Sequence, residues 1–263
     1  MDSVKVRRCA TPIVLKQTKK PESAILAIHG FAGYPGELAL VAKTLFNGGF
    51  DIFVPRLPGH GTNGSDFEST GNKEWLASCE EHLLTLLETY KNVSIVGHSM
   101  GGSLALILAT KYNIKKVVLF SPALIVNQLN PLLINIASLF IKKKHIGWQA
   151  DPRYKFFDER DADDDQYLGL EYWSYLYMEQ IKGLAKISKE SLVALKENKS
   201  SILVFTGTED VRVPKKVGSI IYEHDKENNK WINFDKGTHL IPYDIEDEVR
   251  AQAMEETVKW LKQ

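Results

Sequence analysis

The sequence is poor in cysteine, carries no surplus of either charge and has no long hydrophobic run. Its two cysteines, Cys9 and Cys79, fit neither a C-x-x-C motif nor a metal-ligand spacing. We therefore expect reduced thiols and no metal site. Basic and acidic residues number 33 each. This balance argues against nucleic acid or an anionic membrane as a partner.

No apolar stretch approaches the 18 residues that a transmembrane helix needs. Residues 1–12 also lack the apolar core of a signal peptide, so a cytoplasmic location is expected. The 263 residues, 44% hydrophobic and 25% charged, are enough for one large globular domain, with or without an insertion. No oligomeric state follows from these features.

Short apolar runs alternate with longer amphipathic segments along most of the chain. The runs predict buried strands, and the segments between them, such as residues 38–46 and 72–90, have helical periodicity. This alternation predicts an α/β fold with a doubly wound, mostly parallel sheet. Residues 4–16 alternate more loosely and are split by Pro12, which predicts two short strands at a sheet edge. The expected buried strands cover residues 23–28, 50–57, 93–96, 116–121, 202–205 and 230–234.

The rhythm of strand and helix is interrupted once. No strand pattern is evident over residues 123–199, which predicts a helical cap inserted between two parts of the core, 1–122 and 200–263. Within the cap, residues 131–144 are expected to form an amphipathic helix that ends in three lysines. The acidic run 158–165 is interpreted as a solvated loop, because it lacks the glycine and spacing of a metal site.

Residues 97–101 read Gly-His-Ser-Met-Gly and follow directly on a predicted strand. An apolar, alanine- and leucine-rich helix comes next. This combination predicts a nucleophile elbow, in which Ser99 stands at the tip of a sharp turn. Glycine suits positions 97 and 101, because a Cβ atom there would meet neighbouring backbone.

A serine hydroxyl needs a base to take its proton, and the base needs a group to orient it. His239 and Asp210 follow later strands, and the carboxyl ends of such strands meet at one edge of the sheet. We therefore predict a Ser99, Asp210 and His239 triad. Asp235 is the rival acid. The other histidines are given structural roles or lie on helices: His29, His60, His82, His98, His145 and His224.

A tetrahedral intermediate also needs two hydrogen-bond donors for its oxyanion. The backbone N–H of Met100, next to the nucleophile, is one candidate. The second is the backbone N–H of Phe31, in the loop after the first buried strand.

Together, five motifs resemble those of the α/β-hydrolase superfamily: HGF at 29–31, PGHG at 58–61, GHSMGG at 97–102, GTEDVRVP around Asp210 and GTHL around His239. The chain is most similar to bacterial carboxylesterases and monoacylglycerol lipases. The resemblance implies an α/β-hydrolase fold with a cap over the active site, a serine ester-hydrolase mechanism, no cofactor, and oxyanion donors at Phe31 and Met100. One departure is His98, where many close members carry leucine.

The sequence therefore predicts a serine carboxylester hydrolase that acts on small or monoacyl esters of short to medium chain through an acyl-enzyme. Leu133, Phe140 and Trp173 are expected to line the acyl pocket. A thioesterase, a C–C hydrolase or an aminopeptidase with the same triad remains an alternative. A non-catalytic binding module is disfavoured, because binding alone does not require all three triad residues.

Overall fold

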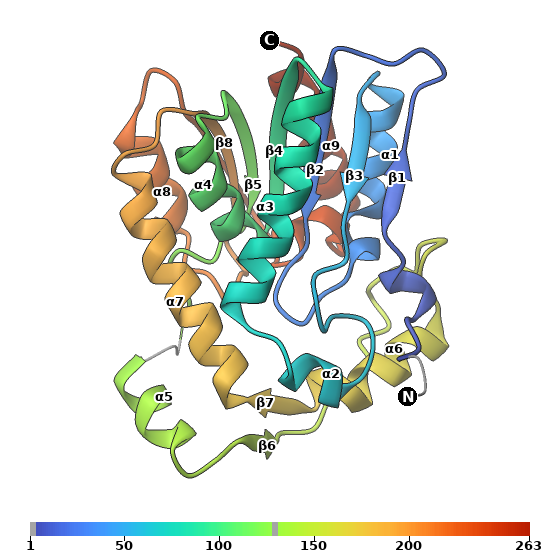
Figure 1. Ribbon diagram of the computed structural model, residues 1–263, viewed down its shortest axis with the longest axis vertical. Helices are drawn as coiled ribbons and strands as arrows, with labels where there is room; N and C mark the ends of the chain where they lie inside the picture. Colours follow the sequence, from blue (N-terminus) through green and yellow to red (C-terminus); the bar gives the residue numbers. More distant parts are fainter. Residues whose placement is uncertain (1–3, 128–130) are drawn as a thin grey trace.

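A seven-stranded sheet forms the centre of the computed structural model, which describes residues 4–127 and 131–263 (Figure 1). The strand order is β1-β3-β2-β4-β5-β8-β9, and every neighbouring pair is parallel except β1 with β3. This arrangement confirms the predicted mostly parallel sheet. The strands are β1 Ile13–Leu15, β2 Ser23–Ile28, β3 Asp51–Val54, β4 Asn92–His98, β5 Lys116–Phe120, β8 Ser201–Gly207 and β9 Lys230–Phe234.

Helices cover both faces of the sheet, which explains why the central strands are apolar along their whole length. Residues 24–28 of β2, for example, are almost completely buried. Helices α1 and α9 pack on one face, and α3, α4, α7 and α8 on the other (Figure 1). Their bounds are α1 Ala39–Asn47, α3 Asn72–Thr89, α4 Met100–Tyr112, α7 Met178–Leu195, α8 Lys216–His224 and α9 Asp247–Lys262, and the short α2 spans Gly64–Glu68.

The N-terminal segment differs from its prediction. Of the two strands expected over residues 4–16, only β1 forms, and Arg8–Ala10 is a 3₁₀ turn. The residues around Arg7 do not pair with the sheet, because Arg7 contacts other parts of the chain. Its backbone N–H donates to the carbonyl oxygen of Gly61, and its side chain forms an ion pair with Asp164.

The segment between β5 and β8 contains the cap, and the expectation that it has no strand is wrong. β6 (Lys143–His145) and β7 (Tyr175–Tyr177) form an antiparallel pair, and the predicted helix over 131–144 already ends at Ser138 as α5 (Pro131–Ser138). The strands have three residues each, too few to show a period of two. The Lys143 ammonium lies 3.9 Å from the ring centre of Tyr175, a cation–π contact between the two strands.

The acidic run is also not a solvated loop. Asp161 caps α6 (Ala162–Leu168) by accepting a hydrogen bond from the Asp164 N–H, and a π-helical turn follows at 169–173. Asp164 is buried and pairs with Arg7 at 2.7 Å, and Asp165 pairs with Arg160 at the same distance. Arg7 comes from 157 positions away, whereas Arg160 belongs to the acidic run itself.

The segment between β5 and β8 thus has two parts. Elements α5, β6, α6 and β7 lie beyond the carboxyl ends of the sheet strands, whereas α7 runs back along α4 (Figure 1). The Thr110 hydroxyl donates to the Ala194 carbonyl oxygen where these two helices meet. Across the described ranges, no helix has the length and apolar content needed to cross a membrane. The domain bounds 1–122, 123–199 and 200–263 stay a prediction.

Candidate active site

Ser99 stands at a sharp turn between β4 and α4. Its φ of 52° and ψ of −117° are rare for a residue with a side chain, and its N–H donates to the Phe120 carbonyl oxygen at 2.9 Å. The turn depends on two glycines. A Cβ atom on Gly97 would lie 2.4 Å from the Gly101 carbonyl oxygen, and one on Gly101 would lie 2.1 Å from that of Ile28. The local sequence therefore forces the serine side chain outward.

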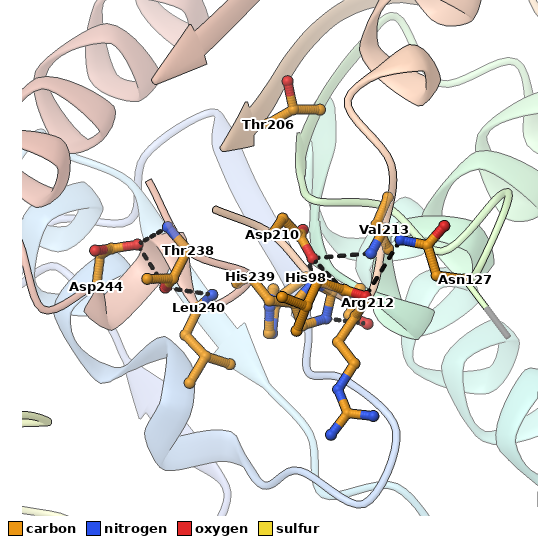
Figure 2. A network of polar contacts seen from close by, with 12 residues as sticks. His98, Asn127, Thr206, Asp210, Arg212, Val213, Thr238, His239, Leu240 and Asp244 are labelled. Carbon is orange, nitrogen blue, oxygen red and sulfur yellow. Dashed lines mark hydrogen bonds and ion pairs between the residues drawn. The ribbon is translucent and has the colours of Figure 1, made fainter. Parts of the chain in front are cut away.

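Three loops that follow β4, β8 and β9 bring together Ser99, Asp210 and His239. The Ser99 Oγ atom lies 2.9 Å from His239 Nε2, and Asp210 Oδ2 lies 2.8 Å from His239 Nδ1. The other carboxylate oxygen of Asp210 accepts the N–H groups of Arg212 and Val213, each at 2.8 Å (Figure 2). Hydrogen bonds therefore hold both carboxylate oxygens of Asp210 in place.

Burial and hydrogen bonding set the ionisation of this group. Burial lowers the pKa of His239, and this outweighs the opposite effect of Asp210. Burial would raise the pKa of Asp210, but the hydrogen bond from His239 and the N–H groups of Val213 and Arg212 lower it overall. At neutral pH the arrangement is a neutral imidazole between a hydroxyl and a carboxylate. It can take a proton from Ser99.

The rival acid lies elsewhere. Asp235 is exposed, and its carboxylate accepts a long hydrogen bond of 3.5 Å from the Thr208 hydroxyl. A different acid that sequence reasoning missed, Asp244, supports the loop of His239. It is fully buried and accepts 2.7 Å hydrogen bonds from both the N–H and the hydroxyl of Thr238 (Figure 2). No motif in the sequence distinguishes Asp244 from the neighbouring acids.

The other histidines near the site contact backbone groups through their ring nitrogens. His29 Nε2 accepts the N–H of Leu57 at 3.1 Å, and His60 Nδ1 lies 3.0 Å from the Pro58 carbonyl oxygen. His98 is buried next to Ser99 and contacts Glu37 and the backbone carbonyl oxygen of His239. Sequence reasoning missed Glu37, because it lies on a short 3₁₀ turn, 35–38, whose charged residue looks like an ordinary helix start.

The two predicted oxyanion donors are Met100, which directly follows the serine, and Phe31, in the loop after β2. Met100 is the first residue of α4, a position whose N–H has no acceptor within the helix. Phe31 follows β2, and its ring packs edge-on against Phe67 and Trp75. No backbone acceptor for the Phe31 N–H is found in the part of the chain that the structure describes.

The predicted acyl-pocket residues have different surroundings. Trp173 is half-buried, and its Nε1–H donates to the Ala32 carbonyl oxygen at 3.1 Å, one residue beyond Phe31. Leu133 and Phe140 are 62% and 83% exposed. The structure therefore brings Trp173 to the loop that carries Phe31, whereas Leu133 and Phe140 present their apolar surface outward. Among residues 4–127 and 131–263, no cluster of three or more His, Cys, Asp or Glu residues could hold a metal ion.

Comparisons with known proteins agree with this architecture. A family model described as "Serine aminopeptidase, S33" matches residues 19–246. The chain is 39% identical over 85 residues to a thermostable monoacylglycerol lipase of Bacillus sp. (strain H-257), a match that spans 32% of this chain and 34% of that protein. It is 23% identical to a carboxylesterase of Bacillus subtilis (strain 168), over 92% of this chain and 95% of that one.

One solved structure, from a description of two metagenome-derived lipolytic enzymes, superposes with a TM-score of 0.82 at 20% identity, over 98% of this chain and 100% of that one. The fold is therefore the α/β-hydrolase fold. This chain spans only about a third of the length of that monoacylglycerol lipase.

Proposed function

Because the chain belongs to the α/β-hydrolase family of the serine aminopeptidase type, we propose that it is a serine ester hydrolase acting on small or monoacyl esters. The observation that carries this proposal is the contact of Ser99 Oγ with His239 Nε2 at 2.9 Å, with Asp210 on the opposite ring nitrogen at 2.8 Å. A hydroxyl, an imidazole and a carboxylate in this order form a catalytic triad, in which the acid orients the base and the base activates the serine.

The chemistry proceeds in two halves. Ser99 Oγ attacks the ester carbonyl carbon while its proton passes to His239 Nε2, and the imidazolium then gives that proton to the departing alcohol. The acyl group is left as an ester on Ser99. Water, activated in turn by His239, attacks this acyl-enzyme and releases the acid. Asp210 keeps the Nδ1–H of His239 in place and stabilises the imidazolium.

The oxyanion of each tetrahedral intermediate is held by the backbone N–H groups of Phe31 and Met100. Met100 supplies the N-terminal end of α4, whose dipole favours negative charge. Phe31 is fixed by its packing on Phe67 and Trp75. Neither donor depends on its side chain's chemistry, so both roles rest on the loops that position them.

The acyl chain is bound by the cap. Trp173 joins the cap to the loop of Phe31 through its hydrogen bond to Ala32, so a chain that leaves Ser99 on this side meets its ring. Leu133, on α5, and Phe140, just after it, offer exposed apolar surface on the cap, and an acyl chain lying over them would bury them. This arrangement supports short- to medium-chain monoacyl esters as substrates, and one relative of the chain is a monoacylglycerol lipase.

The family description also suggests an aminopeptidase, which would need an unpaired acid to hold a substrate amine. Most acids of the acidic run in the cap already have a partner. Asp161 caps α6, and Asp164 and Asp165 are neutralised by arginines. Asp158, at the start of the run, pairs with Lys43. These pairings favour an ester, rather than an amide with a free amine, as the substrate.

The proposal is tested with a substrate panel of nitrophenyl esters, monoacylglycerols, acyl-CoAs and aminoacyl amides, measured for the wild type and for Ser99→Ala. We expect the highest kcat/KM on the oxygen esters and no turnover by the variant. If aminoacyl amides are cleaved faster than the esters, the protein is an aminopeptidase and not an esterase. If acyl-CoAs are cleaved fastest, it is a thioesterase.

A further inference from the structure

A second imidazole and carboxylate lie directly beneath the site, and the reaction as described makes no use of them. His98 precedes Ser99, and its side chain is only 2% exposed. Its Nδ1 atom lies 2.8 Å from Glu37 Oε1, and its Nε2 atom lies 3.0 Å from the backbone carbonyl oxygen of His239. The two imidazole rings are 5.2 Å apart between their centres (Figure 2).

Glu37 extends this contact to the loop after β2. Its side chain is 4% exposed, and Oε1 also accepts the N–H of Gly30 at 2.5 Å. Gly30 directly precedes Phe31, the proposed oxyanion donor. One continuous set of hydrogen bonds therefore joins the Phe31 loop, the nucleophile elbow and the loop of His239.

The geometry determines where the protons are. A carbonyl oxygen can only accept, so His98 Nε2 carries a hydrogen and donates it to His239. Glu37 Oε1 already accepts from Gly30 and lies next to Nδ1, an arrangement that suits a carboxylate receiving a second N–H. The pKa directions agree. Burial alone would lower the pKa of His98, but Glu37 raises it overall, and the charge of His98 lowers the pKa of Glu37 against the effect of burial.

We propose that Glu37 and His98 form a buried ion pair whose task is positioning: it holds the Phe31 N–H and the backbone of His239 in register with Ser99. The inference rests on the proposed function, because it concerns the donors and the base of that reaction. Neither residue touches the substrate. Their effect is on the relative placement of two loops that come from opposite ends of the sequence, and a misplacement of about 1 Å at such a site can cost 10²-fold in rate.

A merely structural pair and a positioning pair respond differently to replacement by apolar residues. Removing one partner leaves the other charge buried, so Glu37→Met or His98→Leu alone should destabilise the fold. Replacing both removes the buried charges together, and such double replacements often restore stability. The N–H of Gly30 and the carbonyl oxygen of His239 would nevertheless lose their partners.

The experiment compares the wild type, both single variants, the double variant Glu37→Met/His98→Leu and the control Leu83→Ala. Leu83 is buried in α3 and belongs to none of the three loops, so its truncation should lower Tm without removing a hydrogen bond of the site. For each protein, Tm, kcat and KM on a nitrophenyl ester and the rate of Ser99 phosphonylation are measured. We expect the double variant to recover Tm relative to the singles, with kcat and phosphonylation about 10- to 100-fold below wild type and KM within about twofold.

Recovery of kcat together with Tm in the double variant would overturn the positioning role. The charge is tested separately by ¹⁵N NMR of labelled histidine in the wild type at neutral pH, which needs no substrate. The His98 signals, identified by their loss in His98→Leu, should show both ring nitrogens protonated, and a single protonated nitrogen would contradict the ion pair. A wild type inactive on every ester in the panel would instead count against the proposed function, while the NMR result would still judge the pair.

Discussion

The Nε2 atom of His239 lies 2.9 Å from the Oγ atom of Ser99, although 140 positions separate the two residues. The contact exists because both residues follow parallel strands of one sheet, β4 and β9, whose carboxyl ends point the same way. Asp210 reaches the same place from the end of β8 and contacts the opposite side of the imidazole. A separate strand thus supplies each member of the proposed triad.

We predict that Asp210→Asn lowers kcat by about 10⁴-fold, whereas Asp235→Asn changes it by less than about threefold. An amide at position 210 would favour the wrong imidazole tautomer, whereas Asp235 faces solvent and Thr208. The two substitutions are chemically identical, so each is the control for the other in steady-state kinetics. Equal losses, or the larger loss at Asp235, would mean that the acid is wrongly assigned.

The pH dependence of kcat/KM should show one ionisation on the acid side. His239 acts as a base only when neutral, so activity falls as pH falls through its pKa. Burial lowers that pKa, with Asp210 and Glu37 opposing the shift and His98 adding to it. The midpoint is therefore expected below the ordinary histidine value of about 6.5. A midpoint well above that value, measured on a substrate that does not itself ionise, would contradict the description of the base.

Substrate preference should depend on the cap. If the acyl chain lies along it, each buried CH₂ contributes about 0.8 kcal/mol, close to fourfold in kcat/KM, until the apolar surface is filled. Activity should therefore rise from acetyl to medium-chain esters and then level off. Profiles are to be measured for Trp173→Ala, Phe140→Ala and Leu133→Trp beside the wild type.

Trp173→Ala should shift the preferred length most, because the hydrogen bond of Trp173 to Ala32 ties it to the loop that carries Phe31. Trp173→Phe is its matched control: it removes the hydrogen bond to Ala32 but keeps an aromatic ring. If all three variants keep the wild-type dependence of kcat/KM on acyl length, the cap only packs on the core and the acyl chain lies elsewhere.

The sheet and the site could be predicted to different degrees. The central strands and the elbow were predictable because local patterns determine them: continuous apolar runs for β2 and β5, and two glycines whose Cβ atoms would clash with backbone. The cap was not. Strands β6 and β7 are short, and their pairing joins segments about thirty positions apart.

Charged residues were the main source of error. The acidic run looks solvated until Arg7, 157 positions from Asp164, is seen to pair with it, and Glu37 looks like a surface acid until His98, 61 positions away, is packed against it. Burial of a charge depends on a partner that only the tertiary structure supplies. Sequence patterns record the position of such a residue but not its partner.

Ser99→Ala should abolish turnover, with a loss on the order of 10⁴- to 10⁶-fold, and leave Tm within a few degrees of wild type. Ser103→Ala is the matched control. Ser103 lies one turn along α4, and its buried hydroxyl has no hydrogen-bond partner in the described part of the chain. Its removal should leave kcat nearly unchanged, and a comparable loss at both serines would point to damage to α4 rather than to loss of the nucleophile.

The most direct test of the account is to treat the wild-type protein with a fluorophosphonate and locate the label by peptide mass spectrometry. The account predicts one phosphonyl group per chain, carried by Ser99, and a label that is strongly reduced in His239→Ala because the hydroxyl then lacks its base. A label on another residue, or an unlabelled Ser99 in a protein that hydrolyses esters, would contradict the central claim that Ser99 is the nucleophile.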